Sequence, residues 1–387
     1  MQPRRTTNRR QVFEALAVGA VPARAFARPL RKLEEIVIYR DEAFYAAFPS
    51  IVRRPDGELL VAFRRAPERR RFGEKLTTHA DPNSQLVLVR SRDGGCTWSR
   101  EPELIYAHPF GGLQDPCMIQ LRNGAILCSS YGWLRLFVNR LEKPRKDIRH
   151  GEFLFLGGLL LRSDDGGRSW KGPFRPPPMP EPDALDPWGQ PLPLFNRGAM
   201  CQGRDGRLFW VVRCFRMGRR PDDLHLLVSE DGGLNWRYSC VAAADPKVAF
   251  SETSLIQTPA GDLVGFVRTM NLDNHTVVIR SRDGGRSFDP WQDAGFQGSP
   301  HHALRLPDGR VWLVYGYRHP PFGVRARILN PECTDFATAP EIVLRDDGGN
   351  ADVGYPWSAL LPGGRVLTVY YFNLADGPRF IAGTICG

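Results

Sequence analysis

The chain has 387 residues, including 39 glycines and 33 prolines, and carries a formal net charge of +10 at pH 7. This many turn-forming residues, with hardly any long amphipathic run, disfavours a helical protein, and the lack of 18 consecutive apolar residues excludes a membrane-spanning helix. No aromatic-interleaved basic helix or RNA-binding motif accompanies the positive charge, so we expect small anionic substrates or anionic glycans as partners and no nucleic acid. A GC-rich genome would also explain the arginine excess.

The first 30 residues differ from the rest of the chain. A basic start with the twin arginines Arg9 and Arg10 precedes a short, mildly apolar stretch that Glu14 interrupts, and small residues follow around Ala25. This pattern resembles a Tat export signal. We therefore expect a periplasmic or secreted protein, or a cytoplasmic one if this segment is not a signal.

Six segments repeat one pattern, in which an apolar strand, a turn containing glycine and a second apolar strand follow one another. They are residues 48–64, 115–131, 197–213, 251–268, 299–318 and 352–372. Their turn glycines lie roughly 50–80 residues apart, which suits four-stranded blades with loops of variable length. The sequence therefore predicts an all-β fold, a six-bladed β-propeller that occupies residues 36–385 as one domain.

Four octapeptides between successive segments share the pattern Ser-x-Asp-Gly-Gly-x-(Ser/Thr/Asn)-(Trp/Phe). They occupy 91–98, 163–170, 229–236 and 281–288. In each, the Asp side chain can accept backbone N–H groups of a tight turn, and the Gly-Gly pair supplies positive φ. We expect these turns to join the third and fourth strands of a blade. A decayed copy lies at 328–336, whereas 346–350 is predicted to be a loop and 132–160 an insertion or long loop in the second blade.

The octapeptides resemble the Asp-box, or BNR repeat, of the sialidase superfamily and of other β-propellers. The resemblance implies that the boxes are structural and lie on the periphery, away from the substrate. It also implies that the chemistry lies at the inner ends of the strands, where six blades face one central funnel.

One hairpin carries the most informative pair of residues. Glu252 opens an inner strand and Arg268 closes the next strand, so both are expected near the axis. This resembles the sialidase pattern of a Glu followed, on the next strand, by an arginine of the carboxylate-binding triad. The same resemblance assigns the last arginine of the triad to Arg325. It assigns the nucleophile to Tyr355, at the start of the sixth inner strand.

The resemblance further places a general acid in the loop after the first segment. Asp81 lies within one residue of the family's acid/base position, counted back from the first Asp-box, and His79 precedes it closely. Asp81 is therefore the expected acid/base, and His79 an expected substrate contact.

The chain departs from the family at the first blade. Sialidases begin this blade with Arg-Ile-Pro, whose Arg is the first member of the triad, but the same register here begins with Ala47. Arg64, Arg65 or Arg318 are the candidates to replace the missing arginine. A site with two arginines would hold a sialic acid less firmly and would also suit a uronic acid, another ulosonic acid or a different anionic glycan.

This set of residues has a chemical rationale. Guanidinium groups bind a carboxylate through two hydrogen bonds. A substrate with a carboxylate at its anomeric carbon would repel an Asp or Glu nucleophile, whereas a neutral phenol avoids the repulsion if a nearby carboxylate takes its proton. Glu252 beside Tyr355 would be that base. The structural alternatives are a core aromatic for Tyr355 and a simple ion pair between Glu252 and Arg268.

Other strand starts offer further funnel residues. The fifth blade carries three histidines that either contact sugar hydroxyls or are structural, namely His301, His302 and His319. Equivalent positions in other blades are candidate subsite residues, namely Asp115, Arg197 and Trp357.

The leading prediction is an exo-acting glycoside hydrolase that releases a terminal acidic sugar from glycans with retention of configuration. The alternatives are a lyase acting on uronic-acid polysaccharides and a glycan-binding propeller that has lost the chemistry. No cofactor or metal is expected, because the eight cysteines form no CxxC or Cys/His zinc spacing, and most are predicted to be buried free thiols. The sugar, the linkage and the oligomeric state stay open.

Overall fold

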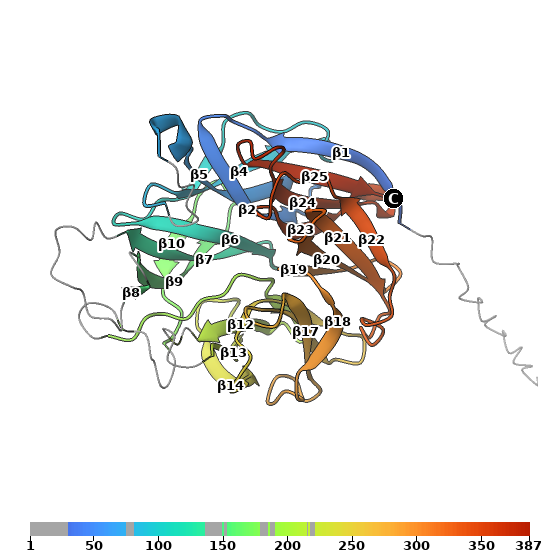
Figure 1. The fold of residues 1–387 in the computed structure, drawn as a ribbon. Helices are drawn as coiled ribbons and strands as arrows, with labels where there is room; N and C mark the ends of the chain where they lie inside the picture. Colours follow the sequence, from blue (N-terminus) through green and yellow to red (C-terminus); the bar gives the residue numbers. More distant parts are fainter. Residues whose placement is uncertain are drawn as a thin grey trace, which may run out of the picture.

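The computed structural model describes residues 30–74, 81–135, 149–150, 153–178, 185, 190–214, 216 and 221–387. The described chain forms six antiparallel sheets, and the innermost strands of neighbouring sheets contact one another around a central axis (Figure 1). The predicted six-bladed propeller is thereby confirmed. The predicted export signal and His79 lie outside the described residues.

Each blade runs from an inner strand at the axis to an outer strand at the periphery. Blade 1 consists of β2 (Phe44–Arg53), β3 (Leu59–Pro67), β4 (Gln85–Ser91) and β5 (Glu103–Tyr106). Blade 2 consists of β6 (Gly112–Gln120), β7 (Ile126–Arg135), β9 (Phe153–Ser163) and β10 (Lys171–Phe174), with β8 (Arg149–His150) paired to β9. Blade 3 consists of β11 (Cys201–Gln202), β12 (Leu208–Cys214), β13 (Asp223–Ser229) and β14 (Arg237–Ala243).

The second half of the ring follows the same plan. Blade 4 consists of β15 (Phe250–Gln257), β16 (Leu263–Thr269), β17 (His275–Ser281) and β18 (Gln292–Gln297). Blade 5 consists of β19 (His301–Arg305), β20 (Val311–Tyr317), β21 (Gly323–Leu329) and β22 (Glu341–Arg345). Blade 6 consists of β23 (Gly354–Leu360), β24 (Val366–Phe372), β25 (Phe380–Cys386) and β1 (Lys32–Tyr39).

Two short 3-10 helices lie between strands: η1 (Arg69–Phe72) lies between β3 and β4, and η4 (Pro362–Gly364) lies between β23 and β24. No described helix is long and apolar enough to cross a membrane. The segment predicted as an insertion at 132–160 is in part regular, because β7 extends to Arg135 and β9 begins at Phe153.

The core lies between the blades. A third strand such as β13 is buried along its whole length, whereas an outer strand such as β5 is largely exposed. Side chains of adjacent blades share one apolar cluster, as Phe266 of blade 4 and Tyr315 of blade 5 do. Stacking of blades therefore supplies the apolar burial that a single sheet lacks.

The ring is closed by the N-terminal strand. β1 pairs with β25, with Lys32 opposite Cys386 and Val37 opposite Ala382, so the first strand of the chain forms the outer edge of the last blade (Figure 1). This pairing places strands from the two ends of the chain in one blade and so holds the ring closed.

The Asp-boxes are turns between the third and fourth strands, as predicted. In the second box Asp165 accepts backbone N–H groups of Arg168 and Ser169 at 3.0 and 2.9 Å, and the hydroxyl of Ser163 at 2.8 Å. Because strands alternate in direction, the boxes lie at the end of each blade opposite to the starts of the inner strands. The structure thus separates these turns from the region where the candidate site residues meet.

Candidate active site

Three inner strands begin with the same backbone distortion. Phe48, Asp115 and Tyr355 each precede a proline, have φ values of 60°, 43° and 53°, and lie where the pairing with the next strand loses its register. A left-handed backbone at a non-glycine residue costs of order 1–3 kcal/mol and persists only where the surroundings hold it. Such bulges redirect side chains, and here they do so at the strand starts around the axis.

Tyr355, Glu252 and Arg268 come together at one end of the axis. The Tyr355 hydroxyl donates to Glu252 Oε1 at 2.9 Å, and Arg268 Nη1 donates to both Glu252 oxygens at 3.0 and 3.2 Å. The same Nη1 lies 3.2 Å from the Tyr355 oxygen. The hairpin β15–β16 of blade 4 holds the carboxylate and the guanidinium side by side, while blade 6, two blades further around the ring, brings the phenol.

The electrostatics of this trio fit an acid/base pair. Burial opposes the charge of Glu252, but the charges of Arg268 and Arg213 and hydrogen bonds to the carboxylate together outweigh it and lower the pKa from the ordinary 4.5 to about 2. Burial and the charge of Glu252 raise the pKa of Tyr355 above its ordinary value. The free protein therefore holds a protonated phenol against an ionised carboxylate.

Two further arginines contact the aromatic ring of Tyr355. The guanidinium carbon of Arg197 lies 4.5 Å from the ring centroid, and that of Arg318 lies 5.3 Å from it. With Arg268 at the hydroxyl, three cations surround one phenol. The charges of Arg268 and Arg318 lower the pKa of Tyr355 and so offset part of the rise that burial and Glu252 cause.

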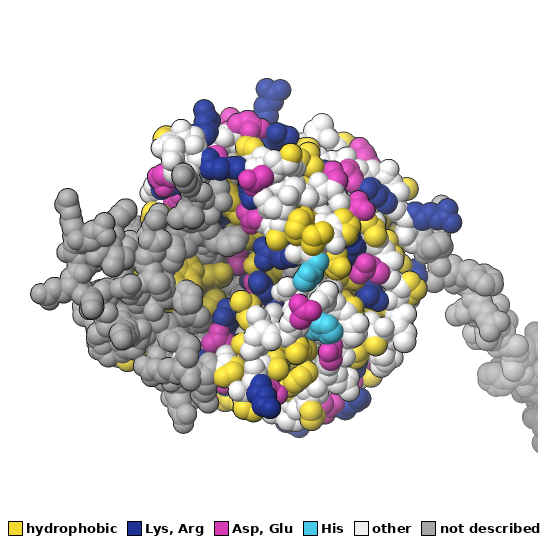
Figure 2. Space-filling model, in the orientation of Figure 1, with side chains coloured by type: hydrophobic (Ala, Val, Ile, Leu, Met, Phe, Trp, Pro, Cys, Tyr) yellow, Lys and Arg dark blue, Asp and Glu magenta, His cyan; other side chains and the backbone are white. Residues whose placement is uncertain are grey.

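A polar cavity of about 610 Å³ opens beside this trio. Its lining residues are Arg268, Asn274, Arg318, Asn350, Ala351, Asp352 and Arg379. The lining thus contains three arginines and one aspartate, and dark-blue and magenta side chains are also mixed across the visible face of the molecule (Figure 2).

The charges in the cavity are unequally paired. Asp352 accepts from Arg379 Nε at 2.7 Å and from the hydroxyls of Tyr45 and Tyr371 at 2.9 Å each, so this carboxylate is fully engaged. Arg318 donates to the Tyr371 hydroxyl at 3.0 Å, and no described carboxylate lies within ion-pairing distance of it. Arg318 and Arg268 are therefore the cations with capacity to bind a carboxylate in the cavity.

The structure corrects the expected second clamp arginine. Arg325 does not line the cavity, because its guanidinium donates to the carbonyl oxygens of Arg345 and Pro321 at 2.6 and 3.1 Å and lies 4.7 Å from the ring centroid of Tyr317. The reason is its position in β21, the third strand from the axis. Arg318, just past the end of the second strand, occupies the place beside Arg268 instead.

The other candidates for the missing arginine lie elsewhere. Arg64 is fully buried, donates to the Leu113 carbonyl oxygen at 3.2 Å and lies 5.4 Å from the ring centroid of Tyr45. Arg65 lies over the ring of Phe44 at 4.4 Å. Neither is among the described residues that line the cavity.

Asp81 is held in an ion pair that opposes its expected role as an acid. It accepts two hydrogen bonds from Arg69 and one from the Asn83 N–H, the latter at 2.8 Å. Burial raises the pKa of Asp81, but the hydrogen bonds from Arg69 and Asn83 and the charges of Arg69 and Arg64 together outweigh it and lower the pKa. Asp81 is 2% exposed and does not line the cavity, so in this conformation it has no proton to give.

Asp115 is a second buried carboxylate near the axis. It accepts from the Tyr131 hydroxyl at 3.0 Å, and its other oxygen has no hydrogen-bond partner in the described chain. Burial raises its pKa to about 6 despite the nearby charge of Arg197. Being 3% exposed, Asp115 is not an open sugar contact in this conformation.

Two of the expected histidine contacts, His301 and His302, are also buried. His319 is half-buried, and its Nε2 lies 3.4 Å from Nδ2 of the cavity residue Asn274. His301 Nε2 lies 2.7 Å from the Thr276 hydroxyl, and burial lowers the pKa of His301 to about 3. His302 stacks on Trp357 with ring centroids 4.5 Å apart, and both line a separate cavity of about 460 Å³ formed by the inner strands further along the axis. His301 is thus not a cavity contact.

Four residues that do line the cavity could not be identified from the sequence, because they belong to no recognisable motif. They are Asn274, Asn350, Asp352 and Arg379.

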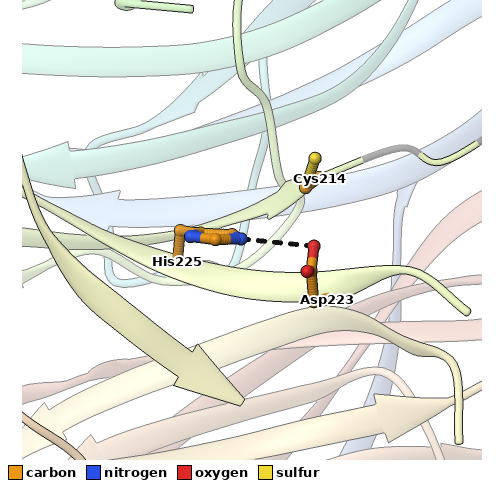
Figure 3. Close-up of side chains that lie close together, drawn as sticks. All are labelled: Cys214, Asp223 and His225. Carbon is orange, nitrogen blue, oxygen red and sulfur yellow. Dashed lines mark ion pairs between the residues drawn. The ribbon is translucent and has the colours of Figure 1, made fainter. Parts of the chain in front are cut away.

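One cluster outside the cavity brings potential metal ligands together. Cys214 of β12 and Asp223 and His225 of β13 lie close to one another, with His225 Nε2 3.2 Å from Asp223 Oδ1 (Figure 3). However, Arg216 donates to both oxygens of Asp223, at 3.1 and 2.7 Å. This cation occupies the oxygens that a metal would need, so the cluster fits an ion-pair network better than a metal site. All eight cysteines are free, and most are buried.

Comparison with known proteins gives a family and a fold. Residues 132–367 match the model of the BNR repeat-like domain. A crystal structure of a protein of unknown function from Dyadobacter fermentans is similar at 55% identity and a TM-score of 0.88, over 92% of this chain and 98% of that chain. No curated protein matches the chain.

Two more distant structures share the fold. The K499G mutant of NanB sialidase from Streptococcus pneumoniae has 13% identity and a TM-score of 0.61, over 93% of this chain and 71% of that chain. The α-L-arabinanase of Penicillium chrysogenum, in complex with arabinobiose, has 15% identity and a TM-score of 0.64, over 92% of this chain and 98% of that chain.

Proposed function

Since the chain belongs to the BNR repeat-like domain family, we propose that it acts on glycans as a retaining glycoside hydrolase that releases a terminal acidic sugar. The observation that carries the proposal is the phenol of Tyr355, hydrogen-bonded to Glu252 and Arg268 beside a cavity with two arginines able to bind a carboxylate. The structural likeness to a sialidase and an arabinanase, both glycoside hydrolases, supports an action on sugars.

In this mechanism Arg268 and Arg318 bind the substrate carboxylate and set the anomeric carbon against the Tyr355 oxygen. The oxygen forms a bond to the anomeric carbon, its proton passes to Glu252, and the bond to the leaving oxygen breaks. Water then cleaves the tyrosyl intermediate with a second inversion, so that the configuration is retained.

The resting pKa values constrain the order of these events. Because the phenol is a weak acid and Glu252 a weak base, complete proton transfer before attack is unfavourable, and transfer must accompany formation of the new bond. Arg268 is shared between Glu252 and the cavity. A substrate carboxylate that binds Arg268 would weaken the attraction between Arg268 and Glu252, and Glu252 would become a stronger base.

Asp81, the expected acid, is kept ionised by its bonds to Arg69 and does not line the cavity, so in this conformation it supplies no proton to the leaving group. We therefore expect glycosides with acidic leaving groups, which need little protonation, to react faster than natural linkages.

The experiment is a screen of umbelliferyl glycosides of ulosonic and uronic acids with the wild type and Tyr355→Phe. Release of a monosaccharide whose first-formed anomer has the substrate's configuration supports the proposal, provided that Tyr355→Phe stays folded and is inactive. An ultraviolet-absorbing unsaturated product would identify a lyase instead. Binding of acidic sugars without any product would identify a binding protein.

A further inference from the structure

Arg197 crosses the axis of the propeller. It precedes β11 in blade 3, yet its Nη2 donates to the carbonyl oxygen of Pro49 in blade 1 at 3.2 Å and to that of Tyr355 in blade 6 at 3.1 Å. The side chain is 1% exposed and does not line the substrate cavity. Arg197 therefore touches the nucleophile and not the space for the sugar.

The hydrogen bond from Arg197 falls on a strained residue. Tyr355 has a φ of 53°, and the ladder between β23 and β24 loses its register around it. A left-handed conformation needs support from its surroundings in a residue with a side chain. The bond from Arg197 to the Tyr355 carbonyl fixes this peptide, and so fixes the direction in which the phenol leaves the backbone.

The charge of Arg197 has no ion-pair partner among the described residues, although it acts at longer range on the nearby carboxyl group of Asp115. The Nε and Nη1 atoms of Arg197 have no hydrogen-bond partner in the described chain. A buried cation in this state is unfavourable for the free protein. Its guanidinium carbon lies 4.5 Å from the Tyr355 ring centroid, so negative charge that develops on this phenol would relieve the cost.

We propose that Arg197 is a positioning residue for the Tyr355 nucleophile: it fixes the strained Tyr355 peptide that aims the phenol at Glu252, and its charge stabilises the phenol oxygen as it becomes anionic. The proposal rests on the proposed function for its kinetic consequence, but the geometry and the charge effect do not require turnover. The other charged or titratable groups around this phenol are Glu252, Arg268, Arg318, Asp115, Tyr131 and Tyr371.

The test compares Arg197→Gln, which removes the charge, with Arg197→Lys, which keeps it. The control is Arg216→Gln, which removes another buried arginine of the same blade that binds Asp223 and does not contact Tyr355. We expect Arg197→Gln to lower kcat about 100-fold, because the variant loses the bond that holds the Tyr355 peptide and small misplacements of a reacting group cost about this much, with KM within about threefold of the wild type. Arg197→Lys should recover about a tenth of the wild-type kcat or more, and Arg216→Gln should keep it.

A second measurement does not depend on activity. The ring carbon that bears the hydroxyl of Tyr355, observed by NMR with labelled tyrosine and assigned with Tyr355→Phe, reports ionisation of the phenol at alkaline pH. Its midpoint should rise in Arg197→Gln, or move out of the accessible range, but stay near the wild type in Arg197→Lys and Arg216→Gln.

Unchanged ionisation and unchanged kcat in Arg197→Gln, with a loss of stability like that of Arg216→Gln, would make Arg197 only a link between blades and overturn the proposal. If Arg197→Gln does not fold, Arg197→Lys is compared with the wild type instead. The proposal is overturned if Arg197→Lys changes the free energy of unfolding but leaves both kcat and the ionisation midpoint of Tyr355 at their wild-type values. If the wild type cleaves no acidic glycoside, the proposed function fails, and the NMR midpoint alone decides the role of Arg197.

Discussion

Replacing Glu252 by glutamine should destabilise the protein by an amount that depends on pH. Folding lowers the pKa of Glu252 from 4.5 to about 2, because the paired charge of Arg268, the charge of Arg213 and hydrogen bonds to the carboxylate together outweigh burial. Each pKa unit corresponds to about 1.36 kcal/mol, so the ionised carboxylate contributes about 3 kcal/mol to the free energy of unfolding at pH 7. A glutamine amide at this position would imitate the protonated carboxyl and leave Arg268 without its counter-charge, so Glu252→Gln should lose about this amount.

The pH dependence follows from the direction of the shift. A carboxylate whose pKa falls on folding stabilises the protein above its ordinary pKa of 4.5, and this contribution disappears as the pH falls towards 2. By pH 3 more than half of it should be lost, and the gap between wild type and Glu252→Gln should narrow accordingly.

The assay is urea unfolding of both proteins at pH 7 and pH 3, followed by tryptophan fluorescence. Glu103→Gln is the matched control, since Glu103 also binds an arginine through two hydrogen bonds but is 44% exposed, and such pairs contribute only about 0–1 kcal/mol. A Glu252→Gln protein as stable as the wild type at pH 7, or a deficit of the same size at pH 3, would refute the assigned electrostatics.

Two further outcomes test the clamp and the turns. Arg318→Lys should weaken binding of the released acidic sugar about tenfold in calorimetry, because lysine cannot form two parallel hydrogen bonds with a carboxylate. Arg325→Lys should bind the sugar as the wild type does. Equal losses of affinity in the two variants would show that Arg325 also binds the carboxylate. Asp165→Ala should lower the free energy of unfolding by about 1 kcal/mol, because turn hydrogen bonds are lost, and should leave kcat per folded molecule unchanged. A fall in kcat without a fall in stability would contradict a purely structural role of the Asp-box.

The sequence by itself determined the features that depend on neighbours along the chain. An Asp-box is closed by hydrogen bonds between residues two to four positions apart, as at Asp165, so its pattern is visible in eight letters. The six repeated strand–turn–strand segments give the blade number for the same reason. The pair Glu252 and Arg268 belongs to one hairpin, and a hairpin register brings its two strand ends together without any other part of the fold.

Only the tertiary structure decided which side chains share the cavity. Arg318 lies beside Arg268, and Arg325 does not, because the closure of the ring and the distance of each strand from the axis set which positions face the cavity. The partners of the remaining site residues are also distant in sequence: Arg379 binds Asp352, and Arg197 reaches Tyr355 from the opposite side of the ring. Strand periodicity predicts the face of a sheet on which a residue lies. It does not predict the bulge at Tyr355, or the burial that lowers the pKa of His301 to about 3. Both arise from contacts between blades that meet only after the ring has closed.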